Sequence, residues 1–128
     1  GFLTQALGDL KTRDSKLKKV KENIKENVAK LAAASNDEKN LLRYQIANEY
    51  FGNAFHAEAL TWFRQIDRAA LEEKYKITGD MVLYSIFMCY HGLLMKEDAL
   101  RVQKTLETFY PESDMNQTVA TMMNYFPE

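Results

Sequence analysis

Residues 46–66 read IANEYFGNAFHAEALTWFRQI, and residues 86–106 read IFMCYHGLLMKEDALRVQKTL. With an offset of 40 residues the two segments share their bulky and small apolar positions: Ile46, Tyr50, Ala59, Leu60 and Ile66 align with Ile86, Tyr90, Ala99, Leu100 and Leu106. Each segment carries two runs of helical periodicity. The surrounding stretch, residues 40–111, therefore predicts one helical hairpin that occurs twice. An internal repeat of this length is typical of proteins built from stacked helix pairs.

The spacing resembles the tetratricopeptide repeat, whose signature runs from a bulky residue to a Leu followed by a small residue, then Tyr, Ala, an aromatic residue and a closing Pro. The first copy supplies matches at Ile46, Ala47, Tyr50, Ala59 and Phe63, and the second at Leu83, Ile86, Tyr90, Ala99 and Pro111. Each copy departs from the signature twice, at Arg43 and Leu71 in the first and at Phe87 and Gln103 in the second. The resemblance covers a little over half of the chain.

The resemblance implies an all-α fold, a short right-handed superhelix of antiparallel helix hairpins. Ala59 and Ala99 are expected where the two helices of a hairpin cross, because only a methyl group fits there. The family period is about 34 residues, so the offset of 40 adds about six. We expect these extra residues to form two further turns of helix after Ile66.

Length and composition predict one domain with long helices. The chain has 128 residues, of which 46% are apolar and 27% charged, with only five Gly and two Pro. These values are ordinary for a globular protein. We divide the chain into an amphipathic helical segment (residues 1–34), two helical hairpins (35–112) and a C-terminal capping helix (113–128).

The boundaries of the helices follow from capping residues and breaks. Ser35 and Glu38 form a capping box, which predicts a helix that starts at residue 36 or 37 and runs to 51, with Gly52 and Asn53 able to take the left-handed turn that ends it. Further helices are expected over 56–75, 80–94 and 96–110. We expect Ser113 to cap the last helix. The apolar side chains expected to face inward on the last two helices are Ala99, Val102, Leu106 and Phe109, and Met115, Val119, Met122, Met123 and Phe126.

The N-terminal segment has a coiled-coil-like pattern. Leu or Ile recurs every seven residues, at Leu3, Leu10, Leu17, Ile24 and Leu31, beside a second line of Leu7, Val20 and Val28 that Asp14 and Lys21 interrupt. Gly8 and the following Thr12–Ser15 predict a break near residue 13, ahead of a helix over 15–33. Three arrangements remain open: a helix lying on the repeats, pairing with a second copy of the chain, or a frayed arm.

The candidate binding site follows from the resemblance, which places the first helix of each hairpin on the concave side. The residues there that avoid the packing positions are Leu41, Tyr44, Asn48 and Phe51 in the first copy and Met81, Tyr84, Met88 and His91 in the second. Met and aromatic side chains suit an apolar peptide or helix, because Met adapts its shape easily. The other interpretation is that a terminal helix fills this groove from within the chain.

Catalytic motifs are not apparent in the sequence. It contains no Gly-rich phosphate loop, no His pair at metal spacing and no Ser-His or Cys-His arrangement, so we expect neither an enzyme nor a cofactor. Cys89 lies within an apolar helical run, and we interpret it as a packing residue. His91 is expected to be a hydrogen-bonded edge residue.

The charge distribution bears on the partners. Residues 11–30 hold eight Lys or Arg and three acidic residues, a local net charge of +5 that leaves −6 for the rest of the chain. No aromatic residue interleaves the basic ones, so we do not expect a nucleic-acid partner. No run is apolar and long enough to span a membrane. Residues 110–113, Tyr-Pro-Glu-Ser, are similar to repeat endings in bacterial cell-envelope proteins, which leaves the compartment open between cytoplasm and cell envelope.

The function predicted from the sequence is a non-catalytic scaffold or adaptor that binds a partner protein or peptide in the concave groove. The alternative is a structural domain that self-associates as a homodimer. In that case residues 3–31 pair between chains and the groove is filled internally.

Overall fold

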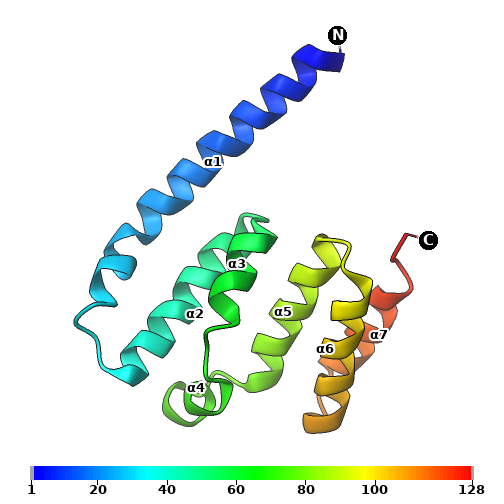
Figure 1. Cartoon of the computed structure of the whole chain (residues 1–128). Coiled ribbons are helices and arrows are strands. Elements are labelled where there is room, and N and C mark those ends of the chain that lie inside the picture. Colours follow the sequence, from blue (N-terminus) through cyan, green and yellow to red (C-terminus); the bar gives the residue numbers. More distant parts are fainter. Residues whose placement is uncertain (1, 128) are drawn as a thin grey trace.

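The computed structural model describes the backbone of residues 2–127 and, within them, all side chains except those of residues 2–7 and 9. Seven helices make up the described chain: α1 (Phe2–Lys30), α2 (Asn36–Gly52), α3 (His56–Phe63), α4 (Arg68–Tyr75), α5 (Gly79–Gly92), α6 (Lys96–Phe109) and α7 (Met115–Met123). Figure 1 shows their arrangement. No strand occurs between residues 2 and 127, so the all-α prediction is confirmed.

The two hairpins, α2–α3 and α5–α6, have the same turn. Ala54 and Leu94 are 40 residues apart, and both adopt the left-handed conformation, with φ of 63° and 60°. In each turn the next backbone N–H, of Phe55 or Met95, donates a hydrogen bond to the carbonyl of Tyr50 or Tyr90, at 3.0 and 2.9 Å. The repeat seen in the sequence is therefore also present in the backbone. The prediction that Gly52 or Asn53 supplies the left-handed residue is wrong, because the helix continues through Gly52.

The small residues of the repeat are completely buried. Ala59 and Ala99 have no exposed surface, and each stands in the first turn of the second helix of its hairpin. Neighbouring hairpins also approach closely where α5 ends beside the start of α3. A Cβ atom added to Gly92 would lie 2.6 Å from the His56 ring, so a larger residue there would have to push that ring aside.

A break after Phe63 corrects the prediction of one helix over residues 56–75. The chain leaves α3 at Arg64 and starts α4 at Arg68. Asp67 caps α4, because its carboxylate accepts a hydrogen bond from the backbone N–H of Ala70 at 3.1 Å. Asn40 on α2 fixes the corner, since its side-chain amide donates to the Asp67 carbonyl and accepts from the Asp67 N–H, both at 2.8 Å.

The six or so residues beyond the usual period thus form a separate short helix rather than extra turns. α4 packs against both α2 and α5, and its Leu71 is completely buried. Lys76, with φ of 60°, then ends α4 in the left-handed conformation. The helix that sequence periodicity treats as continuous is bent so that Leu71 reaches the space between the hairpins.

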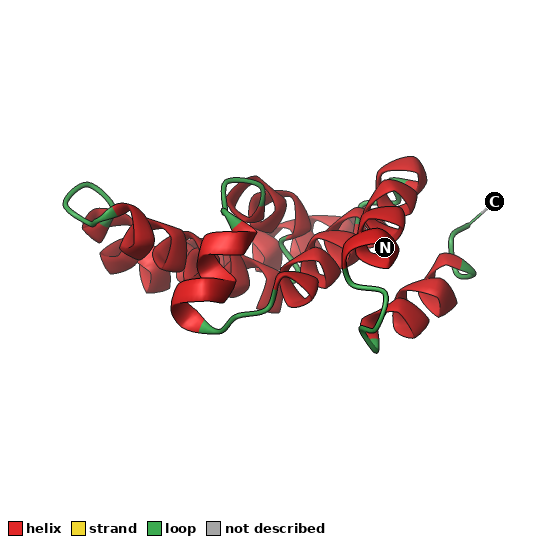
Figure 2. Cartoon of the chain, turned by 90° about the horizontal axis from the view of Figure 1, so that it is seen from below, coloured by secondary structure: helices red, strands yellow, loops and turns green. Residues whose placement is uncertain are grey.

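The helices form two layers. α2, α5 and α7 run in the same direction along the chain, and α3 and α6 run in the opposite direction on one side of them (Figure 1). Figure 2 shows the chain from below, and at its C-terminal end α6 and α7 lie in different layers. α7 packs against both α5 and α6. Its buried residues, Val119 in the helix and Phe126 just after it, join the core.

The N-terminal helix is continuous from Phe2 to Lys30, so the predicted break near residue 13 is wrong. The hydroxyl of Thr12 donates to the Gly8 carbonyl at 3.0 Å within the helix, and no Pro interrupts the run. The helix also ends earlier than the predicted residue 33. The side of α1 that carries Val20 and Ile24 is buried, α1 packs on α2, and its N-terminal end projects past the hairpins (Figure 1).

Arg13 fastens α1 to the first hairpin. Its guanidinium lies 4.7 Å from the centre of the buried Phe55 ring and 3.9 Å from the carboxylate of Glu58. Beyond this contact, towards the N-terminus, Leu10 is 58% exposed. The C-terminal part of α1 is therefore the part that lies on the first hairpin.

Candidate functional site

The predicted groove residues of α2 are all half-buried. Tyr44 and Phe51 pack edge-on against Phe63 of α3, with ring centroids 6.4 and 6.1 Å apart. Leu41 lines an apolar hollow of about 340 Å³ between the end of α1 and the start of α2. Asn48 lies between these contacts along the helix. The α2 half of the predicted site is thus partly used in packing the first hairpin.

The predicted groove residues of α5 differ along the helix. Met81, in the first turn, is 43% exposed. Tyr84 and Met88 are half-buried against the core. His91, in the last turn, faces residues 113–126, which we call the C-terminal segment. Its Nε2 lies 3.1 Å from the Met122 carbonyl, and its ring centroid is 4.6 Å from that of Phe126. Met81 is therefore the most exposed of these four residues.

The C-terminal segment covers the His91 end of the predicted groove. Because the Met122 carbonyl can only accept, Nε2 of His91 carries the proton in this hydrogen bond. The sequence prediction of His91 as a hydrogen-bonded edge residue agrees with this contact. Ser113 fixes the other end of the segment, because its hydroxyl donates to the Asp80 carboxylate at 2.6 Å and its oxygen accepts from the Met115 N–H at 3.3 Å.

Two ionisable groups near this face have shifted pKa values. Burial raises the pKa of the Cys89 thiol to about 12, so the thiol stays protonated near neutral pH. Burial also acts to raise the pKa of Asp80, but the hydrogen bonds from Ser113, Thr78 and the Met81 N–H outweigh it, and the net pKa is lowered. Both shifts come from packing and hydrogen bonding between α5 and its neighbours.

Within residues 2–127, no helix is both long and apolar enough to cross a membrane. Among the side chains that the structure describes, no three of His, Cys, Asp or Glu are grouped in a way that could hold a metal ion.

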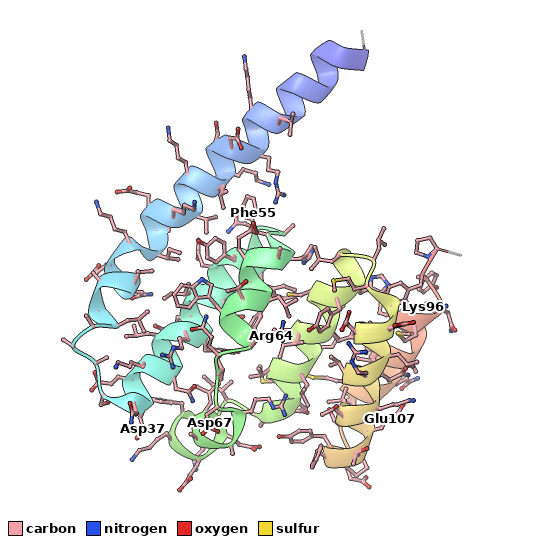
Figure 3. All side chains as sticks on the ribbon, viewed as in Figure 1. Asp37, Phe55, Arg64, Asp67, Lys96 and Glu107 are labelled. Carbon is pink, nitrogen blue, oxygen red and sulfur yellow. The ribbon has the colours of Figure 1, made fainter. Side chains whose placement is uncertain are left out.

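A second groove, which the sequence does not reveal, lies on the other side of α5, between the α3–α4 corner and α6. Its upper part has a volume of about 420 Å³ and its lower part about 620 Å³. Both parts are lined by Arg64 and Arg68, and Figure 3 shows Arg64 at the end of α3. We call this surface the arginine groove, with Leu83, Ile86 and Tyr90 along the upper part and Phe109 and Tyr110 along the lower part.

Phe109 was expected to face inward but is 70% exposed. Leu106, one turn earlier, is fully buried, so the inward face of α6 ends there. Phe109 instead forms part of the wall of the arginine groove. The sequence gives no signal for this groove, because the helix break at residues 64–67 is held by hydrogen bonds from Asn40, which is 27 positions away from Asp67.

Comparison of the chain with models of protein families, with curated proteins and with solved structures found no match.

Proposed function

We propose that the chain is a non-catalytic protein-interaction module of the tetratricopeptide type, a scaffold or adaptor that binds an apolar peptide or helix. The partner would lie on the face formed by α2 and α5, which we call the concave face, across Tyr44, Tyr84 and Met88. The proposal rests on the repeated hairpins, with their identical turns and buried Ala59 and Ala99, and on the Met and aromatic side chains that this face leaves half-buried.

The observation that carries the proposal is the position of α7. This short helix lies against α5 with its Val119 fully buried, and the Phe126 ring just after it contacts the His91 ring. The chain therefore already holds one apolar helical segment on the α5 side of the concave face. The remaining part, from Met81 to Tyr84, presents side chains of the same kind, of which Met81 is 43% exposed. A partner helix would bind by the same apolar contacts.

The experiment begins with affinity capture from a lysate of the source organism. The baits are the wild-type chain and the variant Met81→Glu, Tyr84→Ala, and captured proteins are identified by mass spectrometry. Each candidate is then purified, and its Kd is measured by isothermal titration calorimetry. Burying a Met or Tyr side chain contributes about 1.5 to 3 kcal/mol. The variant should therefore raise the Kd of a true partner by at least about tenfold.

Leu100→Glu is the matched control, because Leu100 is also a helical residue, is 40% exposed and lies on α6. Circular dichroism must show that all three proteins are folded. A purified partner that binds the folded Met81→Glu, Tyr84→Ala variant as tightly as wild type would contradict the proposal. A partner lost from the Leu100→Glu variant instead would place the interaction on α6.

Self-association is the second candidate function, and the exposure of α1 favours it. Leu10 is 58% exposed and Val28 is 41% exposed, although both belong to the apolar pattern of that helix. Sedimentation velocity over a range of protein concentrations tests it. A dimer that becomes a monomer in Leu10→Asp would support pairing through α1, and a wild-type monomer at the highest concentration would rule it out.

A further inference from the structure

The arginine groove exists because the first hairpin has a short second helix. α3 has eight residues, whereas its counterpart α6 has 14. At 1.5 Å per residue, α3 stops about 9 Å short of the length of α6. The chain turns at residues 64–67 and passes to α4, which packs on α2 and α5. A groove therefore lies beside the lower half of α6, in the place that the second half of a longer α3 would occupy in a regular repeat.

The shape of the arginine groove suits a short peptide segment. Its two parts share Arg64 and Arg68, so they adjoin at these two side chains. Buried Leu83 and Ile86 border the upper part. Phe109, with 70% of its surface exposed, stands at the lower part. Large exposed aromatic residues next to a concave surface are frequent anchors of protein interfaces.

Some of the charged side chains on the walls of this groove have partners within the described part of the chain, and others do not. Arg101 is paired with Asp98, and the Asp67 carboxylate accepts the N–H of Ala70. Arg64 and Arg68 form no ion pair with the side chains that the structure describes.

Glu72, also on the wall, offsets part of the charge of Arg68. Burial and the charge of Glu72 raise the pKa of the Tyr110 hydroxyl, and Arg68 lowers it, so both charges act on that hydroxyl. Arg64 is exposed at the end of α3, and in the upper part of the groove Arg64, Arg68 and Arg101 outnumber the single carboxylate there, that of Asp98. Carboxylates of a bound segment are the best acceptors for the guanidinium groups of Arg64 and Arg68.

We propose that the arginine groove binds an acidic peptide segment of a partner protein. One or two carboxylates of the segment pair with Arg64 and Arg68, and a neighbouring apolar side chain lies against Phe109 and the apolar floor. The segment takes the place that the second half of a longer α3 would have occupied. This site is on the opposite side of α5 from the concave face, so the inference does not depend on the function proposed above.

A random-peptide library displayed on phage tests this inference without knowledge of the natural partner. Selection on the immobilised wild-type chain should enrich peptides with Asp or Glu beside a large apolar residue. Synthetic versions of the enriched peptides are then titrated into each protein. The Kd should rise about tenfold in the double variant and should also rise with salt concentration.

Two further variants separate charge from shape. Ala69→Trp places a large side chain on the wall of the groove at an exposed position of α4, and it should abolish binding. Lys18→Gln, Lys25→Gln removes the same charge from exposed positions of α1 and should leave the Kd unchanged. Thermal unfolding should differ little among these proteins, because exposed substitutions usually change stability only slightly.

Three results would overturn the inference. The first is that no peptide is enriched on the wild-type chain. The second is that the enriched peptides lack acidic residues or bind the Arg64→Gln, Arg68→Gln variant with the wild-type Kd. The third is that the peptides lose binding in Met81→Glu, Tyr84→Ala but not in Ala69→Trp, which would place them on the concave face.

Discussion

The corner between α3 and α4 should depend on a single side chain, Asn40. Its amide makes two hydrogen bonds of 2.8 Å with the backbone of Asp67, and Asn40 is only 5% exposed. Substitution Asn40→Ala removes both bonds, which contribute about 1 kcal/mol each. It also leaves two partly buried backbone groups without their partner. We therefore expect the free energy of unfolding to fall by about 2 to 3 kcal/mol, and the melting temperature by roughly 10 °C.

Urea unfolding followed by circular dichroism measures the global effect. Asn48→Ala is the matched control, because Asn48 lies on the same helix, is half-buried and forms no side-chain hydrogen bond with the residues that the structure describes. The higher helix propensity of Ala benefits both variants equally. Amide hydrogen exchange should show the largest loss of protection in α4. A fall below about 0.5 kcal/mol, or a fall equal to that of Asn48→Ala, would refute the role given to Asn40.

Three further predictions concern the second hairpin and its neighbours. Ala99→Leu should destabilise the chain by about 1 to 3 kcal/mol through overpacking of the helix crossing, and an unchanged urea midpoint would contradict the placement of this residue. Cys89 should not react with a thiol reagent in the folded protein at pH 8 but should react fully in urea, because burial raises its pKa to about 12; rapid modification of the folded chain would contradict its burial. The folded-state pKa of Asp80 is lowered, so its stabilising contribution is present above its unfolded pKa of about 3.9 and is lost as pH falls through the folded value. Urea midpoints should accordingly fall less in acid for Asp80→Asn than for wild type, and equal acid dependence would contradict the hydrogen bond from Ser113.

The sequence predicted the features that depend on local periodicity. The hairpins, the offset of 40 residues and the burial of Ala59 and Ala99 all follow from spacing along the helices, because a position in a helical period largely decides whether a side chain faces the core. The start of α2 was also predictable, since the Ser35 side chain accepts the Glu38 N–H at 3.3 Å. Signals of this kind lie within a few residues of the structure that they determine.

The features that the sequence could not predict depend on contacts between distant residues. Asn40 reaches 27 positions along the chain to Asp67, and nothing near residues 63–67 breaks the helical pattern as Pro or Gly would. For the same reason the arginine groove had no sequence signature. The cover over His91 also comes from residues more than 30 positions away. The sequence could predict that His91 forms a hydrogen bond at the edge of the repeats, but it could not predict which segment of the chain covers His91.

The central claim, that the concave face binds a partner, is tested most directly by NMR of the six methionine methyl groups. Met81 and Met88 report on the concave face, Met95 lines the arginine groove, and Met115, Met122 and Met123 report on α7. Titration with a partner purified by affinity capture should shift the methyl signals of Met81 and Met88 and leave that of Met95 unchanged. Saturating binding that shifts Met95 alone, or shifts neither Met81 nor Met88, would contradict the proposed function.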